Sequence, residues 1–214
     1  MNTAFRLGGG ILILLILKKL FDKRTTDASA GGNKDAASSS ASATQECDSS
    51  SSGRDYEVFL SFRGEDTRTN FTDHLYNALL EKGIHTFRDN EELRIGEKID
   101  QGLCSAIHKS KIAIIIFSKG YAFSKWCLFE LAEIVESMES QLKVMPVFYH
   151  VDPSDVRNQT GCYQNAFREH EKNFDLETVE KWKKALKEVG GLKGWDTENT
   201  ADGTYSRADC RFKS

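Results

Sequence analysis

The segment KIAIIIFS (residues 111–118) limits the folds open to this chain more than any other stretch. Every side chain between Lys111 and Ser118 is apolar. Such continuous apolar runs are typical of strands buried on both faces, as in parallel sheets that helices cover on each side. Because parallel strands need a crossover between them, helical segments should separate the strands along the chain.

The segments around this strand alternate as expected. Further strands are predicted at residues 57–62, 84–88 and 143–149, with GGLKGW (190–195) offering a short fifth strand, although Pro146 argues mildly against central pairing. Helices are predicted at residues 71–83, 99–110, 124–135, 162–172 and 177–189. The sequence therefore predicts an α/β fold with a parallel sheet of four to five strands and helices on both faces.

Sheets of this class bind ligands beyond the carboxyl ends of their strands. The segments expected there are residues 63–68, 89–98, 118–125 and 150–161, and the last contains the predicted loop VDPSDVRNQTG. Three of them converge where the helix with Glu130 begins. A helical glutamate is usually a solvated surface group, and this helix also carries Glu133, Glu136 and Glu139. Only its position near the helix start separates Glu130 from these.

The first 24 residues differ from the rest of the chain. An apolar run at residues 11–17 is followed by Lys18 and Lys19, and by two further basic residues. The run is shorter than the roughly 20 residues of a comfortable membrane span, and no small-residue cleavage site follows it. We expect residues 1–24 to form a marginal hydrophobic membrane anchor, with residues 7–20 at the membrane and the protein body in the cytosol. A cleaved targeting peptide is the alternative.

The composition indicates a linker after the first segment, and it argues against nucleic-acid binding and against a metal site. Residues 25–54 are rich in Ser, Ala and Gly and lack large apolar side chains, so we expect a disordered linker there. A net charge of −3 argues against a nucleic-acid partner. Five cysteines lie singly without a C-x-x-C pair, and we therefore expect no metal site.

Four motifs follow one another between residues 55 and 195: YEVFLSFRGEDTRTNF, FRDNEELRIGEKI, SKWCLFELAEI and PVFYHVDPSDVRNQTGCYQNAF. With these motifs the chain resembles the TIR (Toll/interleukin receptor) domain of plant immune receptors, most of all those with a hydrophobic N-terminal anchor. The resemblance implies a flavodoxin-like fold over residues 55–195. That family continues into a nucleotide-binding domain and leucine-rich repeats. No G-x-x-x-x-G-K-[ST] motif occurs, so the resemblance implies a TIR-only or truncated form.

The C-terminal segment departs from the family pattern. TIR domains normally continue with a last amphipathic helix, which packs beside the first helix and forms a self-association face with it. Residues 196–214 are instead polar and show no apolar stripe. We therefore expect the last helix to be missing and this segment to be a tail outside the family pattern.

The resemblance implies cleavage of the bond between nicotinamide and ribose in NAD+, which is then a substrate, and no cofactor is expected. Glu130 matches the catalytic glutamate of the family. Its expected role is to bind the ribose hydroxyls and to stabilise the developing positive charge. The product would be ADP-ribose or a cyclic compound. The alternative is a catalytically weak adaptor or decoy that associates with full-length TIR receptors.

The resemblance also implies that the loop after the first strand lines the NAD+ site. This loop consists of Arg63, Gly64, Glu65, Asp66, Thr67 and Arg68. Gly64 permits an unusual turn, Asp66 or Thr67 can cap the following helix, and the two arginines can meet phosphate. An ordinary strand-to-helix turn with exposed arginines is the plainer alternative.

Two further residues belong to the implied site. Gly96 lies in a loop that the family uses to gate the site and to contact the next subunit, although it also suits an ordinary turn. Trp126 can stack on a nucleotide ring, or it anchors the helix start in the core. The implied partners are further copies of the chain or other TIR domains, at the cytoplasmic face of an endomembrane, in plant immune signalling.

Overall fold

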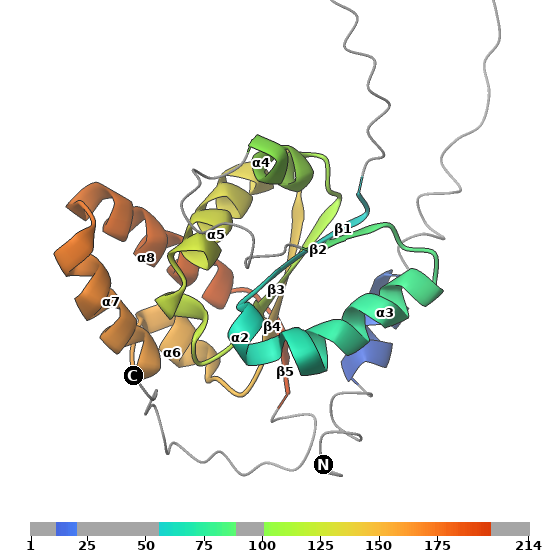
Figure 1. Ribbon diagram of the computed structural model, residues 1–214, viewed down its shortest axis with the longest axis horizontal. Coiled ribbons are helices and arrows are strands. Elements are labelled where there is room, and N and C mark those ends of the chain that lie inside the picture. Colours follow the sequence, from blue (N-terminus) through green and yellow to red (C-terminus); the bar gives the residue numbers. More distant parts are fainter. Residues whose placement is uncertain (1–11, 21–55, 89–100, 198–214) are drawn as a thin grey trace, which may run out of the picture.

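The computed structural model describes residues 12–20, 56–88 and 101–197 (Figure 1). At its centre lies a five-stranded sheet whose neighbouring strands are all parallel. The strand order β2-β1-β3-β4-β5 is the flavodoxin-like order, with its switch point between β1 and β3. The predicted flavodoxin-like α/β fold is confirmed. The strands are β1 (Val58–Phe62), β2 (Thr86–Arg88), β3 (Ile112–Phe117), β4 (Lys143–Phe148) and β5 (Trp195–Asp196).

Strands β1 and β3 are apolar apart from Ser61, and helices cover both of their faces. All residues of β1 are buried, and they pair in register with residues 112–116 of β3. Alternate side chains of a strand point to opposite faces of the sheet. The structure accordingly contains two buried hydrophobic clusters, one on each face.

Pro146 lies inside β4, between β3 and β5, despite the argument against central pairing. The register places it opposite Ile115 of β3, whereas β5 pairs only with Val147 and Phe148. The short fifth strand therefore does not depend on a hydrogen bond from Pro146. A Cβ on Gly194 would collide with the Pro146 carbonyl oxygen, so the absence of a side chain lets the chain approach β4 here.

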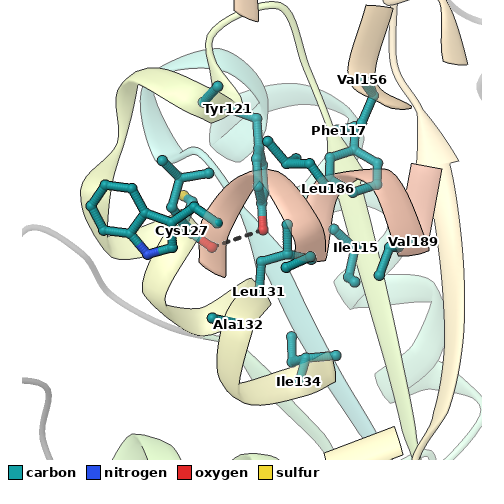
Figure 2. Close-up of a cluster of buried hydrophobic side chains, with 14 of the residues drawn as sticks. Ile115, Phe117, Tyr121, Cys127, Leu131, Ala132, Ile134, Val156, Leu186 and Val189 are labelled. Atoms are coloured by element: carbon teal, nitrogen blue, oxygen red, sulfur yellow. Dashed lines mark hydrogen bonds between the residues drawn. The ribbon is translucent and has the colours of Figure 1, made fainter. Parts of the chain in front are cut away.

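One face of the sheet, which we call the α5 face, packs against a group of helices (Figure 1). Figure 2 shows part of this cluster, with Leu131 and Ile134 on α5 and Ile115 and Phe117 on β3. The helices that contribute are α4 (Gln101–His108), α5 (Lys125–Met138), α6 (Pro153–Asn158), α7 (Cys162–Asn173) and α8 (Leu176–Gly190).

Helix α6 lies within the segment that the sequence analysis predicted to be a loop, and that prediction was wrong for Pro153–Asn158. The side chain of Asp152 caps the helix, because its Oδ1 accepts a hydrogen bond from the Ser154 N–H at 2.7 Å. An aspartate cap followed by proline in the first turn favours a helix start. The signal for α6 was therefore present in the sequence.

The opposite face, which we call the α3 face, carries the helical segment that follows β1. This segment begins at Gly64, earlier than the predicted start near Phe71. It consists of α2 (Gly64–Thr67), a π-helical turn labelled η1 (Arg68–Thr72) and α3 (Asp73–Glu81). Phe71, Leu75 and Leu79 are fully buried against the sheet.

Residues 12–20 form a helix on the α3 face, and we call it the N-terminal helix (blue in Figure 1). It buries the five side chains of Leu12, Ile13, Ile16, Leu17 and Leu20 in the same cluster as α3 and the strands. Burying a Leu or Ile side chain contributes about 1.5–3 kcal/mol, whereas ordering the backbone of each residue costs about 1–2 kcal/mol. The burial of these side chains therefore opposes the ordering cost of the segment with a term of the same order.

This packing does not support the membrane anchor that the apolar run predicts. No helix among the described residues is long and apolar enough to cross a membrane. The N-terminal helix is only about 14 Å long at 1.5 Å per residue. The predicted linker at residues 25–54 and residues 198–214 of the predicted tail lie outside the described residues, so the loss of the last family helix stays a prediction.

Candidate functional site

The switch point of the sheet brings together the carboxyl ends of β1 and β3. The chain leaves β1 toward α3 on one face, and it leaves β3 through the 3-10 turn η3 (Tyr121–Phe123) toward α5 on the other face. Ser124 caps the start of α5, because its hydroxyl oxygen accepts a hydrogen bond from the Cys127 N–H at 3.3 Å. Connections that diverge in this way leave a place for ligands at the end of the sheet.

Glu130 reaches from α5 back to β1 at this point. Its side chain is only 2% exposed, and its Oε2 accepts a hydrogen bond from the Ser61 hydroxyl at 2.9 Å. The hydroxyls of Ser61 and Tyr121 also lie 2.9 Å apart. The Tyr121 hydroxyl donates to the Cys127 carbonyl oxygen at 3.1 Å, which is the dashed line in Figure 2. Three polar side chains therefore form a buried cluster inside an otherwise apolar layer.

Tyr121 is fully buried, and this burial is the main reason why its pKa is raised well above the usual value of 10.0. The nearby Cys127 and Glu130 raise the pKa of Tyr121 further, whereas the hydrogen bond with Ser61 lowers it. The phenol thus stays protonated at neutral pH. Its hydroxyl can donate a hydrogen bond without adding negative charge beside Glu130.

The loop after β1 is tied together by ion pairs. Arg63 pairs with Glu65 and, at 3.1 Å between Nη1 and Oδ1, with Asp66. Its guanidinium is thus engaged with carboxylates of its own loop, and a phosphate would have to compete with them. The side chain of Glu65 is 76% exposed.

Asp66 connects the two loops of the switch point. Its Oδ2 accepts hydrogen bonds from the Ser118 hydroxyl at 2.5 Å and from the Gly120 N–H at 3.0 Å. The predicted capping role is wrong, because no side-chain cap is formed at the start of α2, η1 or α3. The carboxylate is used instead to join the segment after β1 to the segment after β3.

The remaining residues of this loop pack locally. Thr67 is buried, and its Oγ1 donates to the Arg63 carbonyl oxygen at 3.4 Å. The Arg68 guanidinium lies 5.3 Å from the centroid of the Phe62 ring and also against Gly64, where a Cβ would crowd it. Stacking of a cation on an aromatic face is favourable, and it fixes Arg68 beside the carboxyl end of β1.

Of the two further predicted residues, only Trp126 is described. It is half-buried at the start of α5, with its ring centroid 6.3 Å from that of Phe129 and the Lys125 Nζ 4.9 Å from its own. This placement fits the packing alternative better than a free stacking surface. Gly96 lies outside the described residues.

Comparison with known proteins identifies the fold. The sequence profile of the TIR domain family matches residues 55–204. The chain belongs to the TIR domain family. It is 49% identical over 166 residues to the TMV resistance protein N of Nicotiana glutinosa. This match covers 76% of this chain and 14% of that protein. It is also 52% identical over 141 residues to the disease resistance protein RPV1 of Vitis rotundifolia. That match covers 65% of this chain and 10% of that protein.

A solved TIR structure is also similar. The TIR domains of the activated Roq1 resistosome, which directly recognises the pathogen effector XopQ, match with a TM-score of 0.65 and 51% identity. The match covers 70% of this chain and 92% of that chain. The TIR domain is thus shared almost entirely, whereas this chain spans only a small part of the curated relatives' length.

Three residues of the site in this TIR domain were missed in the sequence analysis: Ser61, Ser118 and Tyr121. Ser61 is the one polar side chain within β1, and a lone polar residue in a buried strand needs a partner. That signal was present in the sequence. The partner of Ser61 was not, because Glu130 lies 69 residues further along the chain.

Proposed function

We propose that this TIR domain cleaves NAD+ at the bond between nicotinamide and ribose, in plant immune signalling, when several copies assemble. The observation that carries the proposal is the position of Glu130 at the switch point of the sheet, held by Ser61. The disease resistance function in the names of the relatives supports the signalling role. The similar TIR domains in an activated resistosome support assembly.

The reaction requires little acid or base chemistry from the protein. The bond between C1′ and the nicotinamide nitrogen breaks, and its electron pair leaves with nicotinamide as a neutral base. C1′ then develops oxocarbenium character, as in glycoside hydrolysis. Water adds to C1′ and releases a proton, which gives ADP-ribose. Attack by an adenine nitrogen of the same molecule gives a cyclic product instead.

Glu130 supplies electrostatic stabilisation in this proposal. Its carboxylate binds the ribose hydroxyls and lies near the positive charge that develops at C1′. Ser61 orients the carboxylate through Oε2, and the neutral Tyr121 avoids a second negative charge beside it. Because Glu130 is 2% exposed, NAD+ reaches it only after groups at the strand ends move, and assembly provides that movement.

A nicotinamide-release assay on the purified full chain tests the proposal. Release from NAD+ should rise more than in proportion to protein concentration, because the active form is an assembly. Glu130→Gln keeps the size of the side chain and an oxygen that accepts from Ser61, but it removes the charge. We expect it to lower the rate about 100-fold or more.

A matched control lies on the same helix. Glu136 forms an exposed ion pair with Lys181 at 2.6 Å, so Glu136→Gln removes the same charge from α5 without touching the switch point. Its rate should stay close to that of the native chain. Absence of nicotinamide release by the native chain at every concentration, or equal release by Glu130→Gln, would overturn the proposal.

The second candidate function is a non-enzymatic adaptor that associates with full-length TIR receptors. The observation that favours it is the burial of Glu130, which is hydrogen-bonded as a structural carboxylate would be. Co-expression with an autoactive TIR receptor separates the two candidates. An adaptor binds that receptor and alters its output equally well with Glu130→Gln. The adaptor function fails if the chain neither binds the receptor nor changes its output.

A further inference from the structure

The N-terminal helix has a distinct buried side and a distinct exposed side. Leu12 and Ile16 are fully buried, and the neighbouring Leu14 and Leu15 are 66% and 41% exposed. The buried positions recur at the spacing of one face of a helix. The cluster that receives them contains apolar residues of α3, β1, β3 and β4. The helix is therefore bound to the domain through one defined face.

The N-terminal helix and α3 divide the α3 face between them. The Lys19 Nζ lies 4.7 Å from the centroid of the Trp195 ring, and Trp195 belongs to β5 at one edge of the sheet. Helix α3 contacts β2 at the other edge. The N-terminal helix thus lies toward the β4–β5 side, where Met145 and Val147 of β4 belong to the shared buried cluster.

We propose that the β4–β5 side of the α3 face is a docking surface for an amphipathic helix, and that its occupant is the N-terminal helix of the same chain. The helix docks and leaves while the rest of the domain stays folded. The helix is only nine residues long and is held through one face, with Leu14 and Leu15 exposed on the other, so it can leave without breaking the pairing of the strands beneath it.

The covalent connection makes docking within one chain the favoured arrangement. Residues 21–55 join the helix to the domain, and a chain of that length extends to about 120 Å at most, so reach does not limit docking. Tethering raises the local concentration of the helix to the order of millimolar. The docked helix lies on the face opposite Glu130, and its release leaves the cluster around Ser61 intact.

Amide hydrogen exchange on the full chain tests the proposal. Amides of residues 12–20 should be measurably protected in the native chain, yet exchange faster than those of β3, because local release precedes global unfolding. Ile16→Asp places a charge in the buried face and should lower the protection of residues 12–20 by about tenfold or more. Leu14→Asp, on the exposed side, should change it less than about twofold.

A milder variant keeps the test decisive if Ile16→Asp disturbs folding. Ile16→Ala should lower the protection of residues 12–20 by about threefold or more while β3 remains protected. Equal effects of Ile16→Ala and Leu14→Ala, or no protection of residues 12–20 in the native chain, would overturn the proposal. So would protection that depends on protein concentration, which indicates a second copy as occupant. Protection that appears only with phosphatidylcholine and phosphatidylserine vesicles would assign the helix to lipid instead.

Discussion

The two faces of the sheet differ in the polarity of the side chains that they bury. The α5 face contains a buried polar cluster in which Ser61, Tyr121 and Glu130 contact one another across β1, η3 and α5. The buried cluster of the α3 face consists of apolar side chains from the strands, α3 and the N-terminal helix. Polar groups are costly to bury unless they are hydrogen-bonded, and a bonded network fixes the relative positions of its members. The α5 face therefore positions Glu130 through polar contacts. The α3 face buries mainly apolar side chains, beside the hydrogen-bonded pair of Thr67 and Thr72 at 2.7 Å.

The largest expected effect tests the apolar face. Leu75→Ala removes a fully buried side chain of α3 from the cluster and should lower the free energy of unfolding by about 2–5 kcal/mol. Leu80 is 45% exposed on the same helix, and Leu80→Ala should cost less than about 0.5 kcal/mol. Urea denaturation measures both, and similar values for the two variants would contradict the assignment of the buried side.

A smaller effect is expected from the polar face. Ser61→Ala removes the donor to Glu130 Oε2, so a buried carboxylate loses a partner, and unfolding should become easier by about 1–3 kcal/mol. Ser137 is the matched control. It is a buried serine like Ser61, but it lies on α5 and donates at 2.8 Å to the Glu133 carbonyl oxygen of its own helix. Ser137→Ala should cost at most about 1 kcal/mol. Equal losses would argue that the Ser61 contact adds nothing beyond a local bond.

The smallest effect appears only at alkaline pH. Burial raises the pKa of Tyr121 well above 10.0, so the folded state keeps the phenol neutral while the unfolded chain ionises. The contribution of the neutral Tyr121 to the free energy of unfolding is fully present below pH about 10, and it is lost as the pH rises above that value. Tyr121→Phe removes this group and should make the decline less steep by about 1.4 kcal/mol per pH unit.

The opposite face again provides the comparison for this experiment. Tyr149 is half-buried beside the α3-face cluster, 5.4 Å from Phe71 between ring centroids, and burial raises its pKa as well. Because the shift of Tyr149 is smaller, Tyr149→Phe should change the alkaline slope over a narrower pH range. Free energies of unfolding measured from pH 9 upward compare the two variants, and an equal gain in alkaline stability from both substitutions would contradict the difference in burial.

The sequence could predict the sheet because each buried strand carries its own signature. A short continuous apolar run such as residues 112–117, rich in β-branched residues, is typical of a strand buried on both faces. The segment that forms the N-terminal helix was predicted to be a membrane anchor instead, and this error has a physical reason. Leu14 and Leu15 are apolar although exposed, and they hide the helical stripe that Leu12, Ile16 and Leu20 form. A uniform apolar run does not distinguish a lipid partner from a protein partner.

The site was predictable only as single positions. The family resemblance pointed to Glu130 and to the loop after β1, but pairings such as Ser61 with Glu130 join residues far apart in the chain. Whether Asp66 would cap a helix or bridge two loops depends on where β3 ends relative to β1. Local sequence carries no information on that distance, so the capping role was predicted and the contact with Ser118 and Gly120 was not.

The contacts of Asp66 join segments that lead to the two sides of the sheet. One carboxylate oxygen is held by Arg63 and the other by Ser118 and Gly120, so the segments leading into α3 and α5 share an anchor point. Displacing either segment alone breaks charge-assisted hydrogen bonds, whereas displacing both together preserves them. Asp66 thereby favours correlated motion of the two segments. The Cys127 Sγ, which donates to the Phe62 carbonyl oxygen at 3.5 Å, joins the end of β1 to the beginning of α5 as well.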